Sequence, residues 1–126
     1  KEPTVRERCE SAGGDFFESV PKGADAYVMK RILHDWDDQA AIRLLTRCRE
    51  AMNSDGRVLV IDAVMRAGNA PDPNKFMDIS IMALTRGRER TEAEFQKLFL
   101  AAGLRCVKIL PTELPSTLSI IEGIQT

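Results

Sequence analysis

Two apolar segments separated by one helical segment constrain the fold more than any other feature of this chain. Residues 24–33 read A-D-A-Y-V-M-K-R-I-L, and residues 57–64 read R-V-L-V-I-D-A-V. Between them a helical pattern begins after Asp37, a natural N-cap, and ends at the turn N-S-D-G. Short apolar runs rich in β-branched residues are typical of strands covered on both faces of a parallel sheet. The sequence therefore predicts a strand–helix–strand unit and an α/β fold.

Further elements are predicted after this unit. Residues 75–84 are apolar nearly all round, which predicts a helix buried on most sides or facing an apolar pocket. The run T-E-A-E at 91–94 is a capping box, and a helical pattern follows it until Gly103. Only P-T-E-L-P-S-T joins the strands predicted at 104–110 and 118–124, so these two strands should be antiparallel and the sheet mixed.

The first residues predict a weaker element. Residues 4–11 alternate weakly in the strand period and run into G-G-D at 13–15, so we expect a short strand that ends in an acidic loop. The cysteines are Cys9, Cys48 and Cys106, an odd number without a C-x-x-C pair. They are interpreted as small core residues rather than as a disulfide framework or a zinc site.

Composition excludes several classes of protein. The chain has 126 residues, 44% of them hydrophobic and 29% charged, which is one domain's worth of a soluble globular sequence. Its net charge of −1 and the lack of a basic run argue against a nucleic-acid partner. No apolar run approaches the roughly 20 residues of a membrane span, and no signal-peptide pattern occurs. We therefore expect a cytoplasmic protein without a membrane partner.

Polar residues follow or end three predicted strands. Asp15 follows the first, His34 follows the second as the only histidine, and Asp62 lies in the last part of the third. Ligands of open α/β sheets bind outside the carboxyl ends of the strands, so these side chains are expected to converge. His34 is either a general base that takes a proton from a hydroxyl or a histidine that caps a strand end.

A general base of this kind needs a carboxylate to orient it, which Asp62 or Glu89 could supply. The default interpretation of Glu89, within R-G-R-E-R, is a solvated loop. Lys30, at the end of an apolar strand, either contacts a polar group of a ligand or extends to solvent. No phosphate-binding G-x-G-x-x-G or Walker loop, nucleophile elbow or H-E-x-x-H motif occurs.

Five motifs occur in a fixed order: G-G-D-F-F, A-D-A-Y-V-M-K-R-I-L-H-D-W-D-D, G-R-V-L-V-I-D-A-V, F-M-D-I-S and G-R-E-R-T-E-A-E-F. Together they resemble the C-terminal part of the S-adenosylmethionine-dependent small-molecule O-methyltransferases. That family includes plant caffeic acid and flavonoid enzymes, hydroxyindole O-methyltransferase, and bacterial enzymes that tailor polyketides and antibiotics. The resemblance covers essentially the whole chain. It implies a Rossmann-like methyltransferase fold and methyl transfer from S-adenosylmethionine, without a metal, to a hydroxyl of a small aromatic acceptor.

The resemblance also implies catalytic roles. His34, in L-H-D-W, falls on the family's catalytic base, which deprotonates the acceptor hydroxyl for attack on the sulfonium methyl. Asp62 and Glu89 fall on the two acidic residues that orient that base. Plant members usually carry glutamate at the position of Asp62, so this carboxylate is one methylene shorter. It must approach His34 more closely or act through water.

Binding roles follow from the same resemblance. Asp15 and Phe16 correspond to the pair beside the adenine of S-adenosylmethionine, and Lys30 corresponds to a lysine near the cofactor. Asp35 and the region of Met82 border the acceptor pocket.

The resemblance implies that the family's glycine-rich cofactor loop and N-terminal helical dimerisation domain are absent from this sequence. We therefore expect residues 1–126 to be the C-terminal part of the methyltransferase domain, incomplete by itself, of a parent protein that is a homodimer. Without the family's first strands, the strand at 24–33 would have an unpaired edge. The alternative function is a folded but inactive α/β unit that self-associates through that edge. A nucleotide-binding oxidoreductase half-domain would require G-x-G-x-x-G, which the sequence lacks.

Overall fold

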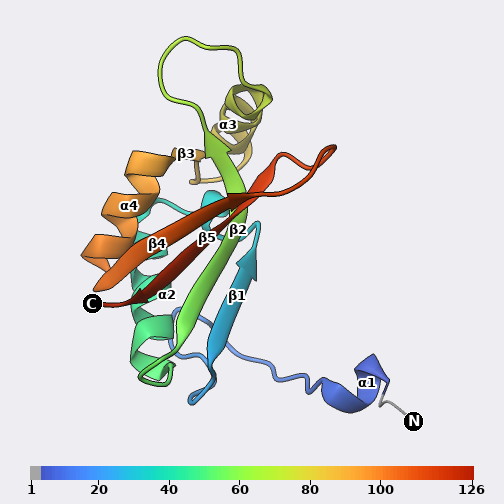
Figure 1. Cartoon of the computed structure of the whole chain (residues 1–126), viewed down its shortest axis with the longest axis vertical. Coiled ribbons are helices and arrows are strands. Elements are labelled where there is room, and N and C mark those ends of the chain that lie inside the picture. The colour runs from blue at the N-terminus through green and yellow to red at the C-terminus, as the bar shows by residue number, and fades with distance from the viewer. Residues whose placement is uncertain (1–3) are drawn as a thin grey trace.

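The structure, a computed structural model that describes residues 4–126, is built around a mixed sheet (Figure 1). Its strand order is β1 (Ala26–Lys30), β2 (Arg57–Met65), β5 (Leu118–Gln125), β4 (Leu104–Pro111). β1 and β2 are parallel, whereas β5 is antiparallel to both β2 and β4. The strand–helix–strand unit, the antiparallel C-terminal pair and the mixed α/β sheet are thus confirmed.

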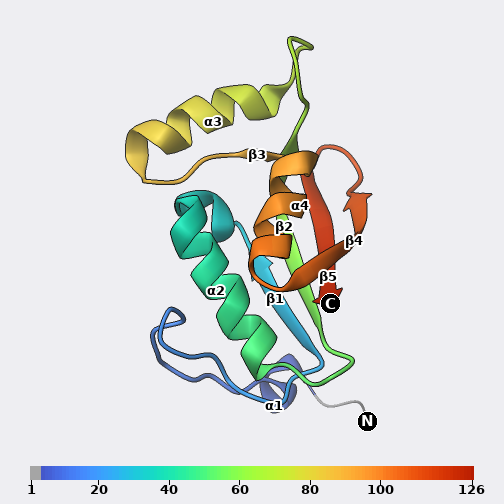
Figure 2. The same ribbon diagram turned by 90° about the vertical axis from the view of Figure 1, so that its left-hand side faces the viewer.

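Two helices cover one face of this sheet (Figure 2). α2 (Asp38–Ala51) begins at Asp37, whose side chain accepts a hydrogen bond from the backbone N–H of Ala40. α4 (Glu92–Ala101) begins at the predicted capping box. The core lies between these helices and the sheet and consists of Met29, Leu33, Ala41, Leu44, Leu45, Cys48, Met52, Val58, Val60, Phe95, Leu98, Phe99, Ala102, Leu104 and Ile121.

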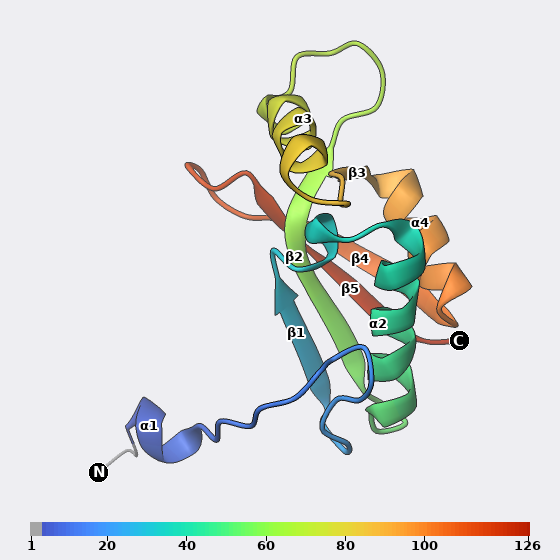
Figure 3. The ribbon, with the colours of Figure 1, turned by 180° about the vertical axis from the view of Figure 1, so that it is seen from behind.

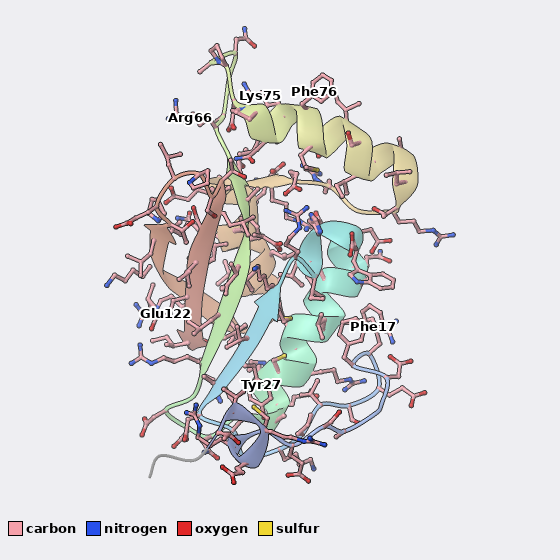
Figure 4. The ribbon with its side chains drawn as sticks, turned by 90° about the vertical axis from the view of Figure 1, so that its right-hand side faces the viewer. Phe17, Tyr27, Arg66, Lys75, Phe76 and Glu122 are labelled. Atoms are coloured by element: carbon pink, nitrogen blue, oxygen red, sulfur yellow. The ribbon has the colours of Figure 1, made fainter. Side chains whose placement is uncertain are left out.

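The opposite face of the sheet is turned toward the viewer in Figure 4, and α2 and α4 lie behind it. Burial alternates along β2 and β5, so the side chains that point away from the helices are only half-buried. They include Leu59, Ile61 and Ile120. On the same face Arg57 forms an ion pair with Glu122. We call these two sides the covered face and the open face.

β1 is shorter and less buried than predicted for residues 24–33. It ends at Lys30, and Arg31 then adopts a left-handed backbone with φ of 54°. Val28 is 60% exposed. The strand has this exposure because, among residues 4–126, its only sheet neighbour is β2. The prediction of a buried strand is therefore wrong for the open face.

The N-terminal segment contains a helix where a strand was predicted. α1 (Val5–Arg8) starts with a capping box in which the backbone N–H of Thr4 donates to the carboxylate of Glu7 over 2.6 Å. The T-V-R-E pattern outweighs the weak alternation. The next residues lead to a turn in which the carboxylate of Asp15 accepts a hydrogen bond from the backbone of Phe17. Asp15 therefore does not follow a strand.

The helix α3 (Pro73–Leu84) projects beyond the end of β2 (Figure 2). Ile81 is its only buried residue, whereas Phe76 is 80% and Leu84 81% exposed. Figure 4 shows Phe76 on the outer side of α3, pointing away from the sheet. The prediction of a helix buried on most sides is wrong for residues 4–126, because an apolar pattern reports a helix's own surface and not what covers it.

The cysteines differ in their surroundings. Cys48 is buried, Cys106 is half-buried and Cys9 is exposed, and all three are free. The prediction of core residues is thus confirmed for Cys48, and it is wrong for Cys9 because that residue lies in the irregular N-terminal segment. In the part of the chain that the structure describes, no helix is long and apolar enough to cross a membrane.

Candidate active site

His34 lies in a short 3-10 turn, η1 (Leu33–Asp35), beyond the carboxyl end of β1 (Figure 3). The residue is 5% exposed. Its Nδ1 lies 3.0 Å from Oε1 of Glu89. A carboxylate only accepts hydrogen bonds, so Nδ1 is the donor and the neutral imidazole keeps its lone pair on Nε2. Nε2 lies 3.4 Å from Oδ1 of Asp35, whose side chain is 43% exposed.

Glu89 reaches His34 from the loop between α3 and α4. It is 1% exposed, and its backbone N–H donates to Oδ1 of Asp78 on α3 over 2.8 Å. At Gly87, a Cβ would lie only 1.7 Å from the backbone oxygen of His34. The loop therefore packs backbone against backbone on the turn that carries the histidine. The default interpretation of a solvated loop is wrong for Glu89, because its side chain is buried and accepts a hydrogen bond from His34 inside the protein.

Arg90 is the second buried charge of this loop, with 1% exposure. Its Nη1 donates to the backbone oxygen of Leu33 over 3.0 Å, and its Nη2 donates to that of Trp36 over 2.9 Å. Nη2 and Nε also donate to Oδ1 of Asp38, over 2.9 and 3.0 Å. Arg90 thus holds both ends of the turn around His34.

Asp62 occupies the last part of β2, opposite Ser119 of β5, and is 1% exposed. Within residues 4–126, neither of its carboxylate oxygens has a hydrogen-bond partner. Burial raises the pKa of Asp62 to about 7, because it penalises the charged carboxylate. The charge of Glu89 acts in the same direction, whereas His34 and the arginines at 90 and 31 oppose it. The structure therefore brings His34, Glu89 and Asp62 into one electrostatic unit.

The residues predicted to contact a cofactor or an acceptor lie around this unit at the surface. Phe16 is half-buried, and its ring packs edge-on against Trp36, with the centroids 6.2 Å apart. Lys30 is exposed at the end of β1, and Met82 on α3 is 54% exposed. Asp35 is the predicted binding residue next to the base, with its Oδ1 3.4 Å from Nε2 of His34. Phe17, labelled in Figure 4, packs beside Trp36 with a centroid distance of 4.7 Å.

The arrangement can act as a proton acceptor. One imidazole nitrogen is held by a buried carboxylate, and the other is left to receive a proton from a hydroxyl. The carboxylate then stabilises the positive imidazolium. Among residues 4–126 there is no cluster of three histidine, cysteine or acidic side chains that could hold a metal ion.

Comparison with known proteins decides the family. The model of the O-methyltransferase domain matches residues 1–105. The chain belongs to this family. It is 42% identical over 122 residues to a phenazine O-methyltransferase of Lysobacter antibioticus, covering 97% of this chain and 35% of that relative.

Solved structures of methyltransferases share the fold of this chain. A methyltransferase of calicheamicin biosynthesis, CalO1, in its S-adenosylhomocysteine-bound form is 46% identical, with a TM-score of 0.88 over 100% of this chain and 37% of its own. An O-methyltransferase of neocarzinostatin biosynthesis, NcsB1, was solved with S-adenosylmethionine and 2-hydroxy-5-methyl naphthoic acid. It is 38% identical, with a TM-score of 0.84 over 97% of this chain and 35% of its own. The chain thus spans little more than a third of each relative.

The surface has a hollow beside Phe16. A hollow of about 310 Å³ is lined there by Gly13, Gly14, Phe16 and Val20, among others. The two glycines have no atom within 4 Å of where a Cβ would stand, so the hollow is open on that side. An aromatic ring beside an open hollow suits a flat purine, and the exposed carboxylate of Asp15 suits an amino donor.

Sequence reasoning missed Arg90 and Gly87. Arg90 was one arginine among several in R-G-R-E-R, and nothing in that run distinguishes a buried guanidinium from a solvated one. The one feature of the sequence that indicates burial of Arg90 is its position directly before Thr91, the N-cap of α4, where the chain must approach the sheet. Gly87 has no indication at all, since its role is set by a peptide far away in the sequence.

Proposed function

We propose that the protein containing this chain transfers a methyl group from S-adenosylmethionine to a hydroxyl of a small aromatic acceptor, with His34 as the general base. The pairing of buried His34 with Glu89 is the observation that carries the proposal. Nε2 of His34 takes the hydroxyl proton while the acceptor oxygen forms its bond to the methyl carbon. When bound, S-adenosylmethionine supplies an electrophilic methyl on a sulfonium, which leaves as the neutral thioether.

The two buried carboxylates have different tasks in this proposal. Glu89 holds the proton on Nδ1 of His34, orients the ring and stabilises the imidazolium. Asp62 places a second acidic group in the same interior and acts on His34 through its charge. Because burial raises the pKa of Asp62 to about 7, the charge that this carboxyl group contributes to the interior changes near neutral pH.

Binding roles are part of the same proposal. Asp15 and Phe16 bind the adenine end of the cofactor, as the hollow beside Phe16 supports, and Lys30 contacts the cofactor at the end of β1. Asp35 and Met82 border the acceptor. The naphthoic acid in the neocarzinostatin relative supports an aromatic acceptor.

The proposal extends to the whole protein. Residues 1–126 form the C-terminal part of the methyltransferase domain, and the glycine-rich cofactor loop and a helical dimerisation domain belong to further sequence of a cytoplasmic homodimer. The support is length, since the phenazine relative has 65% of its sequence outside the part that this chain covers.

A second candidate concerns the chain by itself. The outer edge of β1 is unpaired within residues 4–126, and Val28 on it is 60% exposed. An exposed strand edge pairs readily with another strand. In this candidate the 126-residue chain is folded, inactive and self-associated through β1. A dimeric mass in light scattering supports it, and a monomeric mass at high concentration removes it.

The test of the first proposal is His34→Ala in a full-length protein containing this sequence. We expect the rate of methyl transfer to fall by about 10²–10⁴, the range for loss of a general base. Calorimetric titration of S-adenosylmethionine should give an unchanged affinity, since His34 acts on the acceptor. Lys108→Ala, at an exposed position of β4, is the control and should leave the rate unchanged. Turnover by His34→Ala at the rate of the unaltered protein would remove His34 from the mechanism.

A further inference from the structure

We infer that Arg90 is a positioning residue, which holds the turn that carries His34 in the geometry needed for proton transfer. The inference rests on the proposed function, because it assumes that His34 is the base. Arg90 itself contacts backbone oxygens and a carboxylate of this chain. Its action on the reaction is therefore indirect.

The turn has little to hold it from within. η1 is three residues long, and two backbone hydrogen bonds close it, from the N–H of Asp35 to Ile32 over 3.1 Å and from that of Trp36 to Leu33 over 3.2 Å. Single 3-10 turns have poorer hydrogen-bond geometry than an α-helix. Two residues before the turn begins, Arg31 has a left-handed backbone, which a non-glycine residue adopts at a cost. The position of His34 must therefore be fixed from outside the turn.

Arg90 supplies that restraint on both sides of the histidine. Its guanidinium donates to the oxygens of Leu33 and Trp36, the residues that bracket His34 and Asp35. Without these bonds, the buried oxygen of Leu33 and the part-buried oxygen of Trp36 would each lose a hydrogen-bond donor. One planar fork of N–H groups satisfies two carbonyls and a carboxylate simultaneously, which a lysine ammonium at the same site cannot match in direction.

Arg90 is itself anchored at two places, one through its guanidinium and one through its backbone. Asp38, the first residue of α2, accepts from Nε and Nη2. The backbone of Arg90 pairs with Val64 of β2 in the short strand β3 (Arg90–Thr91). The side chain thus links the central strand, the start of α2 and the histidine turn. Displacements of these three parts relative to one another are resisted by a single residue.

The preceding residues of the loop act on the same turn. Gly87 lies so close that a Cβ would overlap the backbone oxygen of His34. Glu89 holds the imidazole ring through Nδ1. Ring and backbone of His34 are therefore held by adjacent residues of one loop, with Glu89 on the ring and Arg90 on the turn. Loosening the turn should weaken the bond to the ring.

The experiment is Arg90→Lys in a full-length protein containing this sequence, with kcat, the KM for the acceptor, the affinity for S-adenosylmethionine and the pH profile of kcat measured. Lysine keeps the positive charge and loses the fork. We expect kcat to fall by about 100-fold, the effect of a misplacement near 1 Å, while the cofactor affinity stays unchanged. The acidic limb of the profile should move to lower pH, because a weaker bond to Glu89 stabilises the imidazolium less. A residue with only a structural role would not move this limb.

Two controls separate positioning from stability. Arg88→Lys makes the same change two residues away, at a side chain that is 42% exposed and paired with Glu94, and should leave kcat unchanged. Leu104→Ala removes a fully buried side chain at the other end of the sheet. It should lower the melting temperature without moving the pH profile.

The outcomes distinguish this inference from the proposed function. Activity in His34→Ala equal to that of the unaltered protein would defeat the proposed function. An inactive His34→Ala together with an unchanged kcat and pH profile in Arg90→Lys would defeat the inference alone. If Arg90→Lys does not fold, Asp38→Ala decides, since Asp38 is 57% exposed and anchors the guanidinium. We expect a severalfold fall in its kcat with the same shift in pH, and an unchanged profile would overturn the inference.

Discussion

The covered and open faces of the sheet are formed by alternate residues of the same strands, yet they differ in packing. Ile121 is fully buried beneath α2 and α4, whereas its neighbour Ile120 is half-buried on the open face. Both are isoleucines, as a strand covered on two sides would require. The apolar pattern of β5 is therefore that of a strand covered on both faces, whereas within residues 4–126 α2 and α4 cover one face.

The chemistry of the candidate site belongs to the covered face. Val58, Val60 and Asp62 are buried in alternation along β2, so the carboxylate of Asp62 takes the position that the pattern gives to a core side chain. The raised pKa of Asp62 follows from that position. The same helices that build the core therefore remove this group from water.

The largest expected effect comes from removing equal side chains on the two faces. Ile121→Ala should lower the free energy of unfolding of the purified chain by about 2–5 kcal/mol, because it opens a cavity in the packed core. Ile120→Ala should cost about 1 kcal/mol or less, since its side chain remains partly in water. Urea denaturation followed by circular dichroism measures both. Equal losses of unfolding free energy in the two variants would show that the faces do not differ in packing.

The same two substitutions also report on what covers the open face in a longer protein. In a full-length protein containing this sequence, Ile121→Ala should cost what it costs in the chain. A greater loss for Ile120→Ala in the longer protein would show that further sequence covers the open face. An unchanged loss would show that the face remains open there.

A smaller effect is expected from the carboxylate at the end of the covered face. The pKa of Asp62 is raised to about 7 from an ordinary 3.8, so the folded state binds its proton more tightly than the unfolded state. The neutral carboxyl group of Asp62 stabilises the folded state below about pH 4, and this contribution is lost as the pH rises through 7. Asp62→Asn should therefore be more stable than the unaltered chain at pH 8, by on the order of 4 kcal/mol, and the difference should vanish near pH 4.

Denaturant unfolding measured across that pH range tests this prediction. Asp55→Asn, at an exposed position in the turn before β2, serves as the matched control and should give a curve parallel to that of the unaltered chain. If the curves of Asp62→Asn and the unaltered chain stay parallel from pH 4 to 8, Asp62 does not titrate as its burial implies.

The smallest effect concerns a close approach on the covered face. A Cβ at Gly123 would lie 2.6 and 2.7 Å from two ring carbons of Phe99 on α4. Gly123→Ala should cost about 1–3 kcal/mol, because either the ring or the strand must move. Gly13→Ala has no atom within 4 Å of the added carbon and should change stability little. Thermal unfolding compares the two, and equal melting temperatures would mean that Phe99 adapts freely.

The parts of the fold that depend on neighbouring residues could be predicted from the sequence. Asp37 starts α2, and the T-E-A-E box starts α4, because a helix start is decided within four residues. The antiparallel β4–β5 pair followed from a short connection. The same local logic was available for α1, where Thr4 and Glu7 form a capping box that the weak alternation concealed.

The arrangement of the candidate site depends on contacts that local patterns do not contain. Nothing near Arg90 in the sequence indicates that Leu33 and Trp36 will receive its hydrogen bonds. The exposure of Phe76 on α3 depends on the surroundings of that helix rather than on its apolar pattern. The prediction of His34 beside Glu89 came from ordered family motifs, and their roles stay predictions.

The central place of β2 has a consequence for biosynthesis. β2 pairs with β1, which precedes it, and with β5, which lies at residues 118–125. A ribosome releases β1, α2 and β2 well before β5. The edge of β2 that pairs with β5 is therefore unpaired until β5 has been synthesised. Pairing between such distant segments is slow, and an unpaired edge favours aggregation while it lasts. Nascent chains arrested before residue 118 should therefore depend on chaperones more than completed ones.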